Sequence, residues 1–141
     1  MSDLVLVDSC MWIESMRLKG STDIKLGIKG LLDEYAAVLC GPVELEVLGG
    51  ARKNEREQLK EYFSILPYRS SDHTIWRKAA EISWRLRDQG LNCPWNDCII
   101  ATIALEHDYR IYSQDKHFKA IAEILPIRLY TPGYMGMYNP E

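Results

Sequence analysis

The sequence predicts an α/β fold, a three-layer α/β/α sandwich around a mainly parallel central sheet. Short strand-like runs recur at residues 4–7, 37–40, 110–113 and 127–130, and each has the length of a buried strand. Between them, apolar residues recur at helical spacing over longer stretches. Strands that alternate with helices favour a parallel sheet covered on both faces.

Helices are expected between the strands because apolar residues recur there every three or four positions. Their inward-facing residues lie within the stretches 11–16, 24–35, 43–48, 59–66, 75–86, 98–105 and 118–122. Pro42 suits the first turn of a helix, whereas Pro67 ends one. Asp72 is a suitable cap for the helix that Gly90 ends. The helix opened by Asp97 is apolar nearly all round, which indicates a buried helix.

Length and composition are those of a folded protein. The chain has 141 residues, 47% hydrophobic and 26% charged, which excludes a disordered chain, a collagen-like repeat and a small disulfide scaffold. We expect one domain over residues 1–130 and a loose, irregular tail over residues 131–141. The net charge of −3 disfavours a general nucleic-acid binder, but it allows an enzyme that meets phosphates through a metal ion.

The sequence indicates a cytoplasmic protein without membrane contact. The first ten residues lack the basic region of a signal peptide, and no apolar run approaches the roughly 20 residues of a membrane-spanning helix. The four cysteines show no CxxC spacing, so reduced and mostly buried thiols are expected. The three histidines are scattered along the chain, which argues against a zinc site.

Four acidic residues fall near the ends of the predicted strands. Asp8 and Asp115 follow the first and third strands, Glu46 comes soon after the second, and Asp97 opens the buried helix. Parallel strands end at one edge of a sheet, where α/β proteins bind ligands. Carboxylates gathered there repel one another and need protons or a counter-charge. Mg²⁺ or Mn²⁺ supplies that charge and accepts oxygen ligands, so a metal site is predicted.

The same residues also have structural interpretations. Asp8, Asp97 and Asp115 precede predicted helices and suit N-caps, and Glu46 suits a solvated charge near a positive helix end. Glu44 and Glu46 point about 200° apart on a helix, so only one of them can face the crevice.

Four segments form an ordered set: residues 7–14 (VDSCMWIE), 41–52 (GPVELEVLGGAR), 97–101 (DCIIA) and 113–118 (SQDKHF). In this order and spacing they resemble the PIN-domain ribonucleases of the VapC toxin type, and the likeness extends over residues 4–130. In the second motif of that family a Glu stands four residues before a Gly. That offset selects Glu46 with Gly50, and Glu44 is then an exposed charge, or a residue that supports the site from behind if the first turn of the helix is irregular.

The resemblance implies a PIN-like fold and a Mg²⁺- or Mn²⁺-dependent endoribonuclease, the toxin of a toxin–antitoxin pair. It carries catalytic and metal-binding roles onto Asp8, Glu46, Asp97 and Asp115, and a supporting contact onto Ser113. It implies RNA hydrolysis to 5′-phosphate and 3′-hydroxyl ends, a homodimer, and an antitoxin whose C-terminal segment covers the acidic site. Four apolar residues of the first two helices are expected at an exposed interface: Trp12, Met16, Ile24 and Ile28.

Basic and aromatic residues near the predicted site are candidates for RNA contacts. Arg52 and Lys116 are the proposed phosphate contacts, within a basic group that also holds Lys53, Arg56, His117 and Lys119. The charges near residues 51–60 also suit a solvated helix face. Trp95 suits base stacking, whereas Trp12 suits the core or an interface.

The main rival function is a non-catalytic PIN-like module that binds RNA or protein. A phosphorylated receiver domain is disfavoured because Asp3 lies too far upstream of Asp8.

Overall fold

A parallel sheet forms the centre of the computed structural model, which describes residues 3–140; Met1, Ser2 and Glu141 lie outside the described residues. Within that range five strands pair in the order β3-β2-β1-β4-β5, all parallel. The strands are β1 (Val5–Val7), β2 (Ala37–Cys40), β3 (Tyr68–Arg69), β4 (Arg110–Tyr112) and β5 (Arg128–Leu129). The chain starts at the central strand and builds outward first to one side and then to the other.

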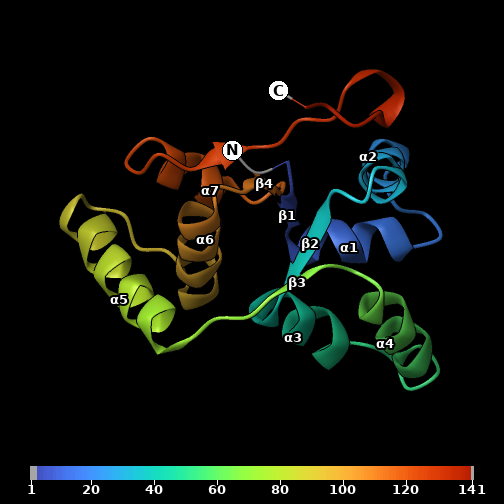
Figure 1. Cartoon of the computed structure of the whole chain (residues 1–141), viewed down its shortest axis with the longest axis horizontal. Helices are drawn as coiled ribbons and strands as arrows, with labels where there is room; N and C mark the ends of the chain where they lie inside the picture. The colour runs from blue at the N-terminus through green and yellow to red at the C-terminus, as the bar shows by residue number, and fades with distance from the viewer. Residues whose placement is uncertain (1–2, 141) are drawn as a thin grey trace.

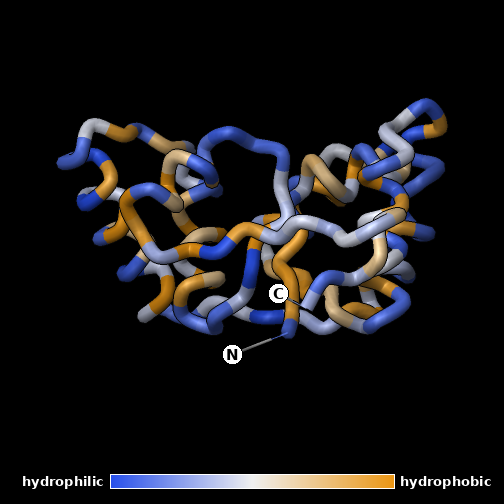
Figure 2. The backbone as a smooth tube through the Cα atoms, turned by 90° about the horizontal axis from the view of Figure 1, so that it is seen from above, coloured by the Kyte–Doolittle hydropathy of each residue, from blue (hydrophilic) through white to orange (hydrophobic). Residues whose placement is uncertain are grey.

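Helices cover the sheet on two sides, which confirms the predicted α/β/α sandwich. The helices are α1 (Ser9–Met16), α2 (Thr22–Asp33), α3 (Gly41–Gly49), α4 (Arg56–Ser64), α5 (His73–Asp88), α6 (Trp95–His107) and α7 (Lys116–Ala122), with a 3-10 turn η1 (Tyr134–Gly136). Figure 1 shows α5 and α6 together on one side of the strands and α1 and α2 on the other. Hydrophilic and hydrophobic residues alternate along the outer helices, as one-sided burial requires (Figure 2).

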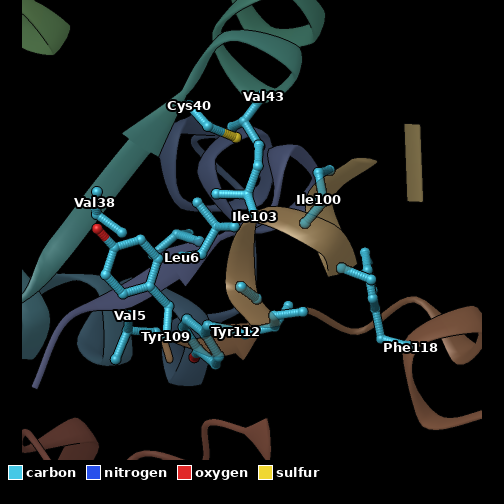
Figure 3. Packing of buried hydrophobic residues seen from close by; sticks show 14 of the residues in the cluster. Val5, Leu6, Val38, Cys40, Val43, Ile100, Ile103, Tyr109, Tyr112 and Phe118 are labelled. Carbon is cyan, nitrogen blue, oxygen red and sulfur yellow. The ribbon is translucent and has the colours of Figure 1, made fainter. Parts of the chain in front are cut away.

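The core lies between the central strands and α6. Leu6 of β1 lies beside Ile103 of α6, and both side chains are fully buried (Figure 3). Helix α6 is buried over most of its length, from Asp97 to Ala104, which agrees with its apolar sequence. Burial of this kind stabilises the fold by about 25 cal/mol for each Å² of apolar surface removed from water. The buried stretch of α6 from Asp97 onward is therefore held in the core.

The structure differs from the sequence-based expectation at three places. Strand β3 was not predicted, because Tyr68 and Arg69 are exposed and carry no apolar signal; the strand pairs only with the edge of β2. Helix α6 begins at Trp95, so Asp97 lies in its first turn and Pro94 is the residue at the cap. Tyr35 is 85% exposed with a positive φ of 53°, outside the end of α2.

The C-terminal segment makes specific contacts instead of lying loose. Residues 131–140 contain little regular structure, but η1 packs on α2. The Tyr138 ring stacks on Tyr130, and its hydroxyl donates to the carbonyl oxygen of Asp3. The buried Arg110 side chain lies 4.9 Å from the Tyr130 ring centroid and donates to the Tyr138 hydroxyl. The segment therefore ties β4 to the residues just ahead of β1.

The first two helices expose fewer apolar residues than predicted. Trp12 and Ile28 are buried, Ile24 is half-buried, and Met16 is 40% exposed. Trp12 packs edge-on against Tyr62 and Phe63, so of the two alternatives left open for it, core or interface, the structure shows the core. All four cysteines are free thiols, as expected. Among the described residues, no helix combines the length and the apolar character needed to cross a membrane.

Candidate active site

Asp8 stands directly after β1, at the centre of the carboxyl edge of the sheet. Asp8 is only 5% exposed, and both oxygens of its carboxylate accept hydrogen bonds. Oδ1 accepts from the backbone N–H of Ser9 at 2.8 Å and so caps α1, while Oδ2 accepts from Ser113 Oγ at 2.8 Å and from Cys10 Sγ at 3.3 Å. Burial first, and then the Asp8 charge, raises the pKa of the Cys10 thiol. Cys10 therefore stays protonated and serves as a donor.

Ser113 connects the ends of β1 and β4. Its hydroxyl donates to Asp8 and accepts from the backbone N–H of Asp115 at 2.9 Å. Asp115 in turn caps α7, because its Oδ1 accepts from the N–H of His117 at 2.9 Å. The capping interpretation thus holds for Asp8 and Asp115, and capping also fixes the direction of each carboxylate toward the same edge of the sheet.

Asp97 and His117 complete a close group with Asp115. Nδ1 of His117 lies 2.9 Å from Oδ1 of Asp115 and 3.1 Å from Oδ2 of Asp97. Among the described residues, these three side chains offer ligand atoms that all lie within 4.8 Å of one another. The Asp97 side chain is 10% exposed, whereas those of Asp115 and His117 are 32% and 31% exposed. The group is therefore buried at Asp97 and partly open at Asp115 and His117; together with the neighbouring Asp8 it is called the acidic hollow below.

The Asp97 carboxyl shows the electrostatic cost of this arrangement. Burial first, and then the charges of Asp115, Asp8 and Glu46, raise its pKa from 3.8 to about 6, against the opposing effect of His117. The other three acidic residues singled out in the sequence thus all act on Asp97 electrostatically. The repulsion that the sequence predicts is present, and a bound cation would relieve it.

Glu46 and Glu44 point to different surroundings. The Glu46 charge contributes to the raised pKa values of Asp97 and of Cys40, whose pKa reaches about 12 chiefly through burial. The Glu44 charge instead contributes, after burial, to the raised pKa of Tyr68. Glu46 is exposed on α3 and lies outside the group of three. The Glu46 charge therefore acts on Asp97 and the Glu44 charge on Tyr68, and Glu44 is half-buried, not exposed as one expectation had it.

The side chains present fit a divalent cation. Oδ2 of Asp97 and Nδ1 of His117 are buried atoms without a hydrogen-bond partner in the described part of the chain, although only 3.1 Å separates them. Buried polar atoms are rarely left unpaired, and an unpaired carboxylate oxygen is especially costly. Two carboxylates and an imidazole are donors that divalent metals accept. Asp97, Asp115 and His117 are therefore the residues that could hold a metal, with Asp8 and Glu46 beside them.

Both basic residues expected to contact phosphate are exposed, one beside the acidic group and one at a separate hollow. Lys116 is exposed in the first turn of α7, between Asp115 and His117 in sequence. Arg52 is exposed beyond the end of α3 and lines a hollow of about 470 Å³ together with Gly50 and Val47. Within residues 3–140, neither side chain forms a salt bridge. Both remain available to an anionic ligand. Trp95 is 73% exposed at the start of α6, two residues from Asp97.

Sequence reasoning missed His117 as a potential ligand. It treated the histidines as scattered, and placed His117 only in the basic group at the rim. The signal that could have found it is its position two residues after Asp115, at the start of a helix whose cap aims at the crevice. The structure brings His117 into contact with Asp97 and Asp115, a position that the spacing of the histidines along the chain does not indicate.

Comparison with known proteins gives consistent matches over nearly the whole chain. The family model described as PIN domain matches residues 5–124. Ribonuclease VapC11 of Mycobacterium tuberculosis is 35% identical over 126 residues, which cover 86% of this chain and 93% of that protein.

Solved structures share the fold at low sequence identity. FitAcB from Neisseria gonorrhoeae superposes with a TM-score of 0.72 at 16% identity, over 91% of this chain and 97% of that one. VapBC2 from Rickettsia felis, solved bound to a DNA fragment from its promoter, gives a TM-score of 0.72 at 17% identity, over 90% and 97% of the two chains.

Proposed function

The chain belongs to the PIN domain family, and on that premise we propose that it is a metal-dependent endoribonuclease that acts as the toxin of a toxin–antitoxin pair. The observation that carries this proposal is the hollow at the carboxyl edge of the sheet, where Asp97, Asp115 and His117 converge beside Asp8. The 35% identity to a VapC ribonuclease over most of both chains supports the same activity.

The proposed mechanism assigns each side chain a physical task. Asp97 and Asp115, with Asp8 and Glu46 beside them, would hold Mg²⁺ or Mn²⁺, which when bound polarises a phosphoryl oxygen and orients water for in-line attack. Ser113 holds Asp8 and the backbone of Asp115 in fixed positions. Lys116 and Arg52 would draw the RNA backbone toward the hollow, since phosphate contacts give affinity without reading sequence.

The antitoxin would occupy a groove formed by two adjoining hollows. The hollow lined by Gly50 and Arg52 adjoins a second one of about 510 Å³ between α1, α2 and α4, and the two share Met16, Glu55 and Leu59. An apolar segment laid along this groove would pass Val47, the residue next to Glu46 in sequence. A basic side chain on that segment would pair with the carboxylates and block the site.

A homodimer would form through a different face. Leu45, Tyr68 and Trp76 are between 52% and 72% exposed, and they line a hollow of about 310 Å³ between α3, β3 and α5. Exposed apolar residues gathered in this way are typical of interfaces.

Cleavage of RNA by the purified chain tests the activity. With Mg²⁺ or Mn²⁺ we expect fragments carrying 5′-phosphate and 3′-hydroxyl ends, and with EDTA no cleavage. Asp115→Asn is the informative variant, because Asn is as good an N-cap as Asp and the variant removes only the charge. It should lose cleavage while keeping its melting temperature, and Glu81→Gln, an exposed acid on α5, should keep both.

Full activity in Asp115→Asn would contradict the assignment of the site. Binding of RNA without cleavage under any metal condition would instead favour the non-catalytic module.

A further inference from the structure

The imidazole of His117 is set into the acidic hollow by its own helix. The backbone N–H of His117 donates to Oδ1 of Asp115, and the next residue, Phe118, is 1% exposed and anchors α7 in the core. Its Nδ1 atom is buried, although nearly a third of the side chain is exposed. The nitrogen therefore faces the carboxylates and the rest of the ring faces outward.

Hydrogen bonding does not account for this position. Nδ1 lies within 3.1 Å of a carboxylate oxygen of Asp97 and of Asp115, yet it forms no hydrogen bond with either. Oδ2 of Asp97 is equally without a hydrogen-bond partner among the described residues, and Asp97 is 7% exposed. Two buried atoms that lie 3.1 Å apart without a hydrogen bond to any described residue indicate that a cation belongs beside them.

The donor set differs from that of a purely carboxylate site. Mg²⁺ strongly prefers oxygen ligands in a near-octahedral arrangement and keeps several waters. An imidazole nitrogen suits transition metals, and affinity at a given nitrogen–oxygen site rises from Mn²⁺ towards the later divalent ions. A nitrogen among the ligands therefore shifts the preference of the site away from Mg²⁺.

We propose that Nδ1 of His117 is a metal ligand, and that with Asp97 and Asp115 it forms a mixed nitrogen–oxygen site that binds Mn²⁺ in preference to Mg²⁺. This inference rests on the proposed function, because it concerns the same hollow. The competing account is that His117 carries a proton and stands in for a cation between the two carboxylates. In that case a metal would have to displace the ring, and removal of the ring would strengthen metal binding.

Metal binding to the metal-stripped full-length protein separates these accounts without any measurement of cleavage. Titration calorimetry gives the affinities for Mn²⁺ and Mg²⁺ in the wild type, in His117→Ala and in His117→Asp, with His73→Ala, an exposed histidine at the start of α5, as the matched control. Pulsed electron paramagnetic resonance on bound Mn²⁺ reports directly whether a ¹⁴N nucleus is coordinated.

The expected result is a ¹⁴N signal in the wild type and in His73→Ala that disappears in both His117 variants. His117→Ala should weaken Mn²⁺ binding by roughly 10-fold or more, at the lower end of the 10–100-fold losses seen even when residues outside a ligand set are replaced. His117→Asp should bind both metals with a smaller preference for Mn²⁺, because all its ligands are oxygens.

Two results would overturn the inference in distinguishable ways. Mn²⁺ that binds the wild type without a ¹⁴N signal, or more tightly in His117→Ala, would remove His117 from the ligand set and leave the proposed nuclease intact. Mn²⁺ and Mg²⁺ that both fail to bind the wild type would overturn the metal site and with it the proposed function.

Discussion

Ser113 Oγ donates a 2.8 Å hydrogen bond to Oδ2 of Asp8 although 105 residues separate the two in sequence. The bond joins the ends of the neighbouring strands β1 and β4, and the same hydroxyl accepts from the backbone of Asp115. A single small side chain thus sets the spacing between two carboxylates of the acidic hollow.

Replacing Ser113 should weaken both the fold and the site. In Ser113→Ala the Asp115 amide loses its acceptor and Asp8 loses a donor, so the free energy of unfolding should fall by about 1–2 kcal/mol. The relative loss of cleavage rate should exceed the relative loss of unfolding free energy, because the carboxylates of Asp8 and Asp115 lose their fixed spacing. Ser113→Thr keeps the hydroxyl and should retain both properties. Urea unfolding and initial cleavage rates measure the two effects, and an Ala variant as active as the wild type would contradict the positioning role.

The raised pKa of Asp97 predicts how stability depends on pH in the metal-free protein. The carboxyl titrates at 3.8 when unfolded and at about 6 when folded, so between these values the folded state binds more protons and stability falls as the pH rises. Above pH 6 the Asp97 carboxyl is ionised in both the folded and the unfolded state, so the loss of stability no longer grows. Asp97→Asn should therefore be more stable than the wild type by about 1–3 kcal/mol at pH 7.5, and no more stable at pH 4.

Melting curves in EDTA at the two pH values check this prediction. Added Mn²⁺ should raise the melting temperature of the wild type but not that of Asp97→Asn, because binding to the folded state alone stabilises it. A variant less stable than the wild type at both pH values would show that the Asp97 charge does not strain the fold.

Phosphate contacts should appear as salt-dependent RNA affinity. Lys116→Gln and Arg52→Gln should raise KM several-fold with little change in kcat, and each should reduce the slope of log affinity against log salt by about 0.7, the contribution of one phosphate contact on a single strand. Arg87→Gln changes an exposed charge at the far end of α5 and serves as the control. An unchanged slope in Lys116→Gln would assign that lysine to solvent.

The apolar face around Trp76 should control the oligomeric state. Trp76→Glu places a charge in the hollow beside Leu45 and Tyr68, and the mass from light scattering should fall from two chains to one 16.3 kDa chain. Trp84 lies on the same helix with 56% exposure but does not line that hollow, so Trp84→Glu should remain dimeric. A wild type with the mass of one chain at micromolar concentration would contradict the dimer.

The packing of the C-terminal segment on α2 should be sensitive to one methyl group. A Cβ at Gly30 would collide with the backbone carbonyl of Gly136, so Gly30→Ala should lower the free energy of unfolding by about 1–3 kcal/mol. Gly49 is also helical, but a Cβ there would meet its nearest neighbour at 3.9 Å, and Gly49→Ala should cost nothing. Equal stability of the two variants in urea would show that the segment is not tightly held.

The sequence was a good guide where local pattern and tertiary structure agree. The apolar runs of β1 and β2, and the apolar surface of α6, signal their burial directly. Strand β3 was missed because two exposed residues take strand geometry only from their neighbour. The ordered tail was missed because its stability comes from Arg110 and Tyr130, which no local pattern connects to Tyr138.

The site was predictable in its charges but not in its geometry. Order along the chain predicts that Asp8 and Asp115 come to one edge, since each follows a strand. It does not reveal that Asp97 is more buried than Asp115, or that the ring of His117 turns inward between them. Those facts depend on side-chain directions set by two helix starts, and sequence periodicity does not encode such directions.

The pairing of β1 with β4 has a consequence for synthesis on the ribosome. Strand β1 is synthesised first, whereas its neighbour β4 and the following Ser113 emerge only after more than a hundred further residues. A nascent chain therefore carries Asp8 without its partners until translation is nearly finished. Prematurely terminated products that stop before α7 contain no assembled hollow, so a host cell would meet the active protein only as a finished polypeptide.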